Sequence, residues 1–174
     1  MFFERWDVLD ENGNSSGKTV LRNKAQLKPG EYHLVVHIWV VSSDGKILIQ
    51  RRSDTKKLMP GEWAATGGAA ISGEDSFTAA SRELYEELGI KSDKNTLKKA
   101  LRLKRRNSLL DVWMITCDLS VEDLSLQETE VAEAKWVTVD EFKSMIKENK
   151  FHNYGKDYFE RVLEKIAQRK GANL

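Results

Sequence analysis

Residues 68–90 read GAAISGEDSFTAASRELYEELGI, and the second half of this stretch decides the central element of the fold. Its apolar residues recur at helical spacing, at about 100° per residue, so they share one face. These residues are Phe77, Ala80, Leu84 and Leu88. The spacing predicts an amphipathic helix from about Asp75 to Leu88.

The ends of this helix are also marked in the sequence. Ser72 or Gly73 is expected to cap its start, because both residue types favour the N-cap position. Acidic residues are expected to fill the first turn, and Gly89 has the residue type preferred just past a helix end.

Three glutamates, Glu83, Glu86 and Glu87, lie within five positions of this helix. Measured from Leu84 at the centre of the apolar face, they lie about 60° (Glu87), 100° (Glu83) and 160° (Glu86) to one side. Unpaired, the carboxylates would repel one another, and a divalent cation would remove that repulsion. Taken alone, the pattern is also typical of a solvated acidic helix face.

Strand patterns surround the helix on both sides. Turn formers in DENGNSSG separate two short runs and predict a β-hairpin. Alternating or continuous runs of apolar residues predict further strands, and apolar residues at helical spacing predict further helices. The expected strands are 4–9, 18–22, 34–41, 45–52, a short one after Trp63, 97–106, 109–119 and 134–139, and the expected helices are 139–149 and 156–170. This order predicts a mixed α/β fold of the α+β type.

The bulk composition sets outer limits on function. The chain has 174 residues, a net charge of +1 and one cysteine, Cys117, so no internal disulfide can form. A single domain over residues 1–174 is expected, with residues 1–28 as an N-terminal hairpin extension. The start lacks a signal-peptide pattern, and the longest apolar run, residues 34–41, is too short to span a bilayer. We therefore expect a cytoplasmic protein with neither a membrane nor a nucleic acid as its partner.

The spacing within residues 68–90 is specific. Gly68 is followed after five residues by Glu74, and after seven more by Arg82-Glu83-Leu84, Glu86-Glu87, Gly89 and Ile90. This resembles the Nudix box, G-x5-E-x7-R-E-U-x-E-E-x-G-U with U aliphatic, at every fixed position. The element order is also similar to the Nudix (MutT-like) fold, in which a mixed β-sheet lies between α-helices.

The resemblance implies a hydrolase that cleaves a phosphoanhydride bond in a nucleoside diphosphate linked to another group, using Mg²⁺ or Mn²⁺ to activate water. It implies that Glu83, Glu86, Glu87 and the carbonyl of Gly68 bind the metal. Glu74 would support them or bind a further ion. Arg82 would pair with a glutamate of the box and hold it in position.

Other positions are less closely defined. The general base is either a glutamate of the box or one from the later loop, in which Glu130 is our choice. Arg51 and Arg52 precede the box on a strand end and are the expected diphosphate-binding residues. The partner is thus a small-molecule diphosphate, and whether the chain forms a homodimer stays open.

Two further features favour structural roles. His33 and His37 are four apart on a predicted strand, about 13 Å, and so cannot chelate one ion together. The stretch 98–106, KKALRLKRR, contains six basic residues that alternation would divide between two faces, which is typical of a solvated edge.

Residues 31–63 are also similar to the branch of the family that includes type I isopentenyl-diphosphate isomerases. Those enzymes carry a cysteine before the box helix, and this chain has AATGGAAISGE there. Those enzymes also bind a metal through several histidines and carry an acidic residue on a later strand. His33 stands where one such histidine is expected, but Ala69 and Ala70 stand where a second would be. Asp111 is a possible remnant of the acidic residue. A complete box without that cysteine favours hydrolysis. An isomerase and a non-catalytic nucleotide-binding module remain the alternatives.

Overall fold

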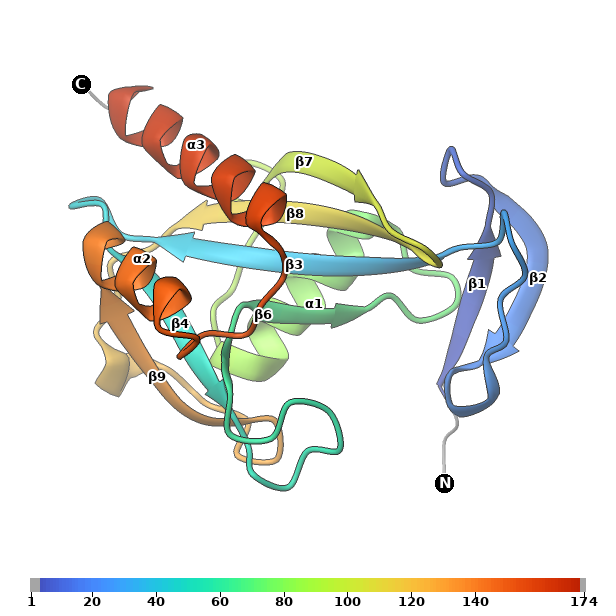
Figure 1. Ribbon diagram of the computed structural model, residues 1–174, viewed down its shortest axis with the longest axis horizontal. Coiled ribbons are helices and arrows are strands. Elements are labelled where there is room, and N and C mark those ends of the chain that lie inside the picture. The colour runs from blue at the N-terminus through green and yellow to red at the C-terminus, as the bar shows by residue number, and fades with distance from the viewer. Residues whose placement is uncertain (1–3, 173–174) are drawn as a thin grey trace. The chain divides into compact units, whose positions relative to one another are not determined.

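The computed structural model describes the backbone of residues 4–172 and the side chains of residues 4–169. It contains strands and helices in an α+β arrangement (Figure 1). The strands are β1 (Arg5–Leu9), β2 (Ser15–Leu21), β3 (His33–Val41), β4 (Ile47–Arg52), β5 (Trp63–Ala64), β6 (Thr66–Ala69), β7 (Lys98–Lys104), β8 (Ser108–Thr116) and β9 (Val131–Val137). The α-helices are α1 (Ser76–Leu88), α2 (Val139–Lys147) and α3 (Lys156–Ala172). The predicted fold class is confirmed.

The strands form two sheets in the described part of the chain. β1 and β2 make a two-stranded antiparallel sheet, which is the hairpin expected at the N-terminus. The other sheet is mixed and seven-stranded, with the order β5-β4-β3-β8-β7, and β6 and β9 pair with β3 and β4. No helix in residues 4–172 is long and apolar enough to cross a lipid bilayer.

The chain folds into two compact units. Unit 1 comprises the described residues up to Ile38, Gly67–Tyr85 and Lys91–Met114. Unit 2 comprises Trp39–Thr66, Glu86–Ile90 and the described residues from Ile115 onward.

In unit 1, the N-terminal hairpin turns at Asp10. The Asp10 carboxylate accepts hydrogen bonds from the backbone N–H groups of Asn12 (2.8 Å) and Asn14 (2.9 Å), so the turn closes within a few residues. β2 consequently begins at Ser15, earlier than the expected residue 18. Leu9 then exchanges backbone hydrogen bonds with Tyr32, which ties the hairpin to the segment before β3.

In unit 2, aromatic side chains build the core around α2 and α3. Trp39 is fully buried, and its indole N–H donates to the Tyr158 hydroxyl at 2.9 Å. Phe142 of α2 meets Trp39 and Phe151 edge-on, with ring centroids 5.3 and 5.0 Å apart. Edge-to-face pairs of this kind add to the free energy gained from burial alone. The amphipathic patterns that predicted α2 and α3 are therefore explained by this cluster.

The start of α1 differs from the prediction. Asp75, rather than Ser72 or Gly73, caps the helix, because its carboxylate accepts from the Thr78 backbone N–H at 2.7 Å. That hydrogen bond is the main reason that the pKa of Asp75 lies below its usual value. Ser72 instead donates to Asp7, and the first turn of α1 contains no acidic residue.

The end of α1 agrees with the prediction. Gly89 has a φ of +72°, in the left-handed region that favours glycine. A Cβ on Gly89 would lie 2.7 Å from the Ser125 side chain, so both the conformation and the space require glycine there.

Candidate active site

The glutamates of α1 are exposed in the order of their angle from the apolar face. Glu87, the nearest in angle, is 3% exposed; Glu83 is half-buried, and Glu86 is exposed. The apolar centre is Leu84, which is fully buried. The helix thus carries one carboxylate into the protein interior and another into solvent, with the third between them.

In unit 1, one guanidinium holds two of the predicted site carboxylates. Arg82 binds Glu74 through both oxygens, with Nε–Oε1 2.7 Å and Nη2–Oε2 3.0 Å. Its Nη1 donates to Glu83 Oε1 at 2.9 Å, and Nη2 also reaches the Ala69 carbonyl at 3.3 Å. Arg82 therefore forms the ion pair with a box glutamate that the resemblance implies, and it pairs with Glu74 as well. We call Glu74, Arg82 and Glu83 the Arg82 cluster.

The backbone at Gly68 lies directly against the Glu83 carboxylate. A Cβ added to Gly68 would fall 2.3 Å from Glu83 Oε1, a distance that no real contact allows. Only glycine leaves room for a carboxylate so close to the main chain. A carboxylate against an open stretch of backbone is a donor set that suits a hard divalent cation.

In unit 2, Glu87 is held by a residue that the sequence reading missed. Gln50 of β4 is 1% exposed, and its Nε2 donates to Glu87 Oε2 at 2.7 Å. The same amide nitrogen lies 3.4 Å from the Ala65 carbonyl. Nothing in the sequence indicates this role for Gln50, because residues 45–52 predict only an apolar strand that ends in Arg51 and Arg52.

The carboxylate and backbone oxygens of this region are of the types that bind a metal ion, although the side chains are not already arranged as a metal-binding cluster. Within residues 4–169, no three histidine, cysteine, aspartate or glutamate side chains lie close enough together to hold an ion. Protein donors instead hold the carboxylates: Arg82 binds Glu83, and Gln50 binds Glu87. The oxygen-rich set is of the kind that Mg²⁺ and Mn²⁺ prefer.

The predicted general base, Glu130, forms an ion pair in unit 2. Lys56 Nζ lies 2.6 Å from Glu130 Oε1 and 2.5 Å from Oε2. The backbone carbonyl of Glu130 also accepts from the Ser53 N–H at 2.9 Å, which fixes the loop beside the end of β4. Glu130 is therefore positioned by two contacts of the loop that precedes the box.

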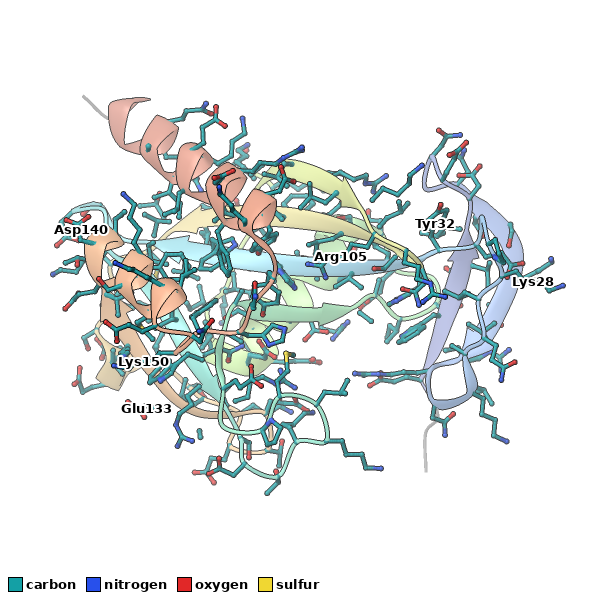
Figure 2. The ribbon with its side chains drawn as sticks, in the orientation of Figure 1. Lys28, Tyr32, Arg105, Glu133, Asp140 and Lys150 are labelled. Carbon is teal, nitrogen blue, oxygen red and sulfur yellow. The ribbon has the colours of Figure 1, made fainter. Side chains whose placement is uncertain are left out.

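The predicted diphosphate-binding arginines are engaged within unit 2. Arg51 pairs with Asp54 at 3.2 Å and with Glu133 of β9 at 3.5 Å. Glu133 is labelled in Figure 2. Arg52 Nε donates to the Leu58 carbonyl at 3.1 Å. Both arginines order the loop after β4, and a role in substrate binding stays a prediction.

His33 has a structural environment, as the strand spacing indicated. Its ring stacks on Trp6 with centroids 4.0 Å apart and planes 6° from parallel. Burial, followed by the positive charge of Arg22, lowers the pKa of His33 to about 4, so the ring is neutral at pH 7. His37 is also buried.

The basic stretch on β7 is not simply a solvated edge. Asp111 of β8 is fully buried, and Arg102 binds both of its oxygens, at 2.6 and 2.8 Å. Lys99 Nζ lies 2.9 Å from the same carboxylate. Plain alternation would put Lys99 and Arg102 on opposite faces, but a β-bulge between Lys99 and Leu101 brings them to the same face. β7 is the last strand of its sheet and both residues are exposed, as the edge interpretation expected. Only the assumed alternation between two faces was wrong here, because the bulge cannot be read from the sequence.

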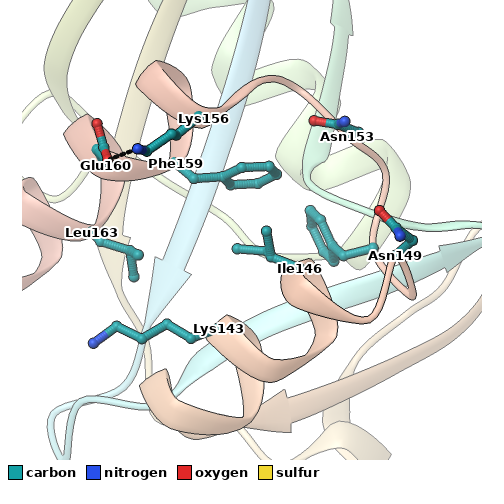
Figure 3. A pocket seen from close by; sticks show the side chains of 9 residues that line it. Lys143, Ile146, Asn149, Asn153, Lys156, Phe159, Glu160 and Leu163 are labelled. Atoms are coloured by element: carbon teal, nitrogen blue, oxygen red, sulfur yellow. Dashed lines mark ion pairs between the residues drawn. The ribbon is translucent and has the colours of Figure 1, made fainter.

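Each unit has a cavity, and neither cavity is lined by most of the predicted site residues. In unit 1, a cavity of about 240 Å³ is lined by Glu74, Ser76 and Arg102 among others. In unit 2, a cavity of about 310 Å³ lies between α2 and α3 and has an apolar floor that includes Phe159 and Leu163 (Figure 3). The second cavity contains none of the predicted site residues.

Comparison with known proteins identifies the family to which these features correspond. The model of the NUDIX domain matches residues 31–160. An uncharacterized Nudix hydrolase of Listeria monocytogenes is 39% identical over 87% of this chain and 89% of its own length. The crystal structure of DR0079 from Deinococcus radiodurans superposes with a TM-score of 0.76 at 25% identity, covering 92% of this chain and 98% of that one.

A relative with a different activity is similar over a shorter region. An isopentenyl-diphosphate Delta-isomerase of Streptomyces griseus is 36% identical over 85 residues, which is 48% of this chain and 43% of its own. The similarity to the isomerase branch noted in the sequence is therefore real but partial.

Proposed function

The chain belongs to the Nudix family, and we propose that it hydrolyses a phosphoanhydride bond in a nucleoside diphosphate linked to another group, or in a related organic diphosphate, with Mg²⁺ or Mn²⁺ as cofactor. The observation that carries the proposal is the Glu83 carboxylate lying against the backbone of Gly68. A bound divalent cation would screen the diphosphate charge and activate water for attack on phosphorus.

The residues of the box have distinct tasks in this proposal. Glu83, Glu86, Glu87 and the Gly68 carbonyl hold the cation. Arg82 fixes the position of Glu83, and Glu74 fixes Arg82 through its two-point ion pair. A bound cation would offset the repulsion between carboxylates one helical turn apart.

Substrate binding is assigned to Arg51 and Arg52 at the end of β4. A diphosphate would take over the guanidinium of Arg51 from Asp54 and Glu133, both of which are exposed partners and weak competitors. Arginine suits this task, because its planar donors match phosphate oxygens.

We predict that Glu130→Gln lowers kcat by about 10² to 10⁴-fold while the metal affinity stays unchanged, because an amide cannot accept the proton of an attacking water. The rate would be measured against metal concentration, with Glu128→Gln, an exposed change in the same loop, as the control. A Glu130→Gln rate equal to that of the wild type would transfer the role of the base to a glutamate of the box.

A panel of diphosphate compounds would test the proposed function. Nucleoside triphosphates, nucleotide sugars, dinucleotide cofactors, oxidised nucleotides and prenyl diphosphates would be incubated with the protein and Mg²⁺ or Mn²⁺, and the products separated by chromatography. Metal-dependent cleavage of one class would support the proposal and name the substrate. No cleavage across the panel with either metal would overturn it.

An isomerase is the second candidate, and isopentenyl diphosphate belongs in the panel for that reason. The partial relative favours it, but two observations oppose it. The segment before α1 has no cysteine, and the acid at position 111 is held by Arg102 and Lys99. Conversion of isopentenyl diphosphate without release of phosphate would establish this alternative.

A further inference from the structure

Gln50 is a polar residue in a position where packing alone would select an apolar one. The preceding residues of β4 are Ile47, Leu48 and Ile49, all buried, and Gln50 itself is 1% exposed. Burying an amide carries a free-energy penalty unless hydrogen bonds compensate for its lost hydration. The reason for an amide at this position must therefore lie in its partners.

The contacts of the amide point to one partner. Nε2 donates to Glu87 Oε2 at 2.7 Å, whereas its approach to the Ala65 carbonyl is longer, at 3.4 Å. The Oε1 atom is buried and has no hydrogen-bond partner among the described residues. Since an ionised carboxylate can only accept hydrogen bonds, the contact with Glu87 fixes which end of the amide faces it. The contribution of the amide therefore comes from its donor, Nε2, and not from its acceptor, Oε1.

The type of donor is also informative. Arg82 holds Glu83 with a positive charge, but Gln50 holds Glu87 with a neutral N–H. A neutral donor fixes one oxygen of a carboxylate and brings no positive charge of its own. Support of this kind orients a metal ligand without itself competing with the cation.

We propose that Gln50 is the positioning residue for Glu87, holding Oε2 and thereby fixing the orientation in which this carboxylate binds a divalent cation. The inference rests on the proposed function and deepens it, because it assigns the orientation of one metal ligand to a residue outside the box. Gln50 does not touch the substrate in this proposal. It acts only through Glu87.

The test is Gln50→Met, which keeps the length of the side chain and removes the donor. Gln168→Met, at an exposed position on α3, is the matched control. Metal affinity would be measured by the rise in melting temperature during Mg²⁺ and Mn²⁺ titrations. We expect an affinity about 10 to 100-fold weaker in Gln50→Met, as for other residues that support metal ligands, and no change in Gln168→Met.

Kinetics separate positioning from a purely structural role. With saturating metal, Gln50→Met is expected to recover most of kcat and to show a nearly unchanged KM for the substrate. A lower melting temperature with unchanged metal affinity would overturn the proposal, because Gln50 would then serve packing only. A wild-type protein without any response to metal would overturn the proposed function itself, and this inference with it.

A second measurement does not depend on the folding of a variant. In the wild-type protein, the side-chain N–H signals of Gln50 in a ¹⁵N–¹H NMR spectrum should shift on addition of Mg²⁺ and saturate at the concentration that saturates the melting temperature. Signals that stay unmoved while the melting temperature rises would show that Gln50 is not coupled to the metal, and would overturn the proposal.

Discussion

Glu87→Gln is expected to lower kcat by at least about 10³-fold at the metal concentration that saturates the wild type. The loss corresponds to about 4 kcal/mol, the scale on which a bound cation stabilises a phosphoryl transition state. The fold should survive, because the introduced amide carbonyl can still accept the hydrogen bond from Gln50. A folded, inactive variant with weakened metal binding is therefore the expected result.

The measurement is the initial rate with the substrate that the diphosphate panel identifies, together with a Mg²⁺ titration of the melting temperature. Glu122→Gln, which removes an exposed acid, is the control and should match the wild type. Glu86→Gln should also lose activity, because Glu86 completes the same proposed set. If Glu87→Gln retains wild-type turnover, the buried carboxylate of α1 is structural and the metal site must be sought elsewhere.

Asp111→Asn is expected to give the largest loss of stability, about 2 to 3 kcal/mol. Removing one partner of a fully buried ion pair costs about 3–5 kcal/mol. Here the loss is smaller because the Arg102 and Lys99 side chains are 35% and 39% exposed and can regain hydration. The melting temperature should fall by roughly 4–12 °C for a chain of this size.

The matched control is Glu11→Gln, which breaks the exposed pair between Glu11 and Lys104 on the same strand, β7. An exposed pair contributes about 0.2–1 kcal/mol, so this variant should stay close to the wild type. Urea denaturation would give both free energies of unfolding. Equal effects of the two substitutions would show that the Asp111 network contributes no more than a surface ion pair.

The difference in unfolding free energy between the wild type and Asp111→Asn is expected to depend on pH, because the Asp111 carboxylate can be protonated. Burial alone would raise the pKa of Asp111, but hydrogen bonds from Arg102, Ser76 and Lys99 outweigh it and hold the pKa below the usual 3.8. Since the folded pKa is the lower one, the stabilisation is fully present above about pH 3.8 and is lost as the pH falls through the folded pKa. The difference between wild type and Asp111→Asn should therefore be constant near neutral pH and shrink in strong acid.

Local patterns predicted most of the elements and the amphipathic face of α1. They missed β6 (Thr66–Ala69) as a separate strand, because its glycines and alanines carry no strand pattern. The angles of Glu87, Glu83 and Glu86 from Leu84 increase in the same order as their exposure. The reason is that a side chain on a regular helix becomes more exposed the further it lies from the centre of the buried face. The resemblance to the Nudix box also implied that Arg82 pairs with a glutamate of the box, and the structure shows Glu83 as such a partner. These features depend on residues close together in the chain.

The features that escaped prediction depend on contacts between distant residues. Gln50 and Glu87 are 37 positions apart, and nothing in either local pattern indicates the other. The pairing of Lys99 and Arg102 with Asp111 requires a bulge whose position is set by the partner strand. Asp75 caps α1, whereas Ser72 donates to Asp7 of the hairpin, a contact between residues 65 positions apart.

The bulge in β7 has a consequence for behaviour in concentrated solution. β7 is the last strand in the order of its sheet, and such a strand offers unpaired backbone groups on which another chain can add. The extra residue at Ala100 interrupts that template, and Lys98 and Lys104 surround it with like charge. The irregularity that brings Lys99 and Arg102 to Asp111 therefore also protects the protein against strand-by-strand aggregation.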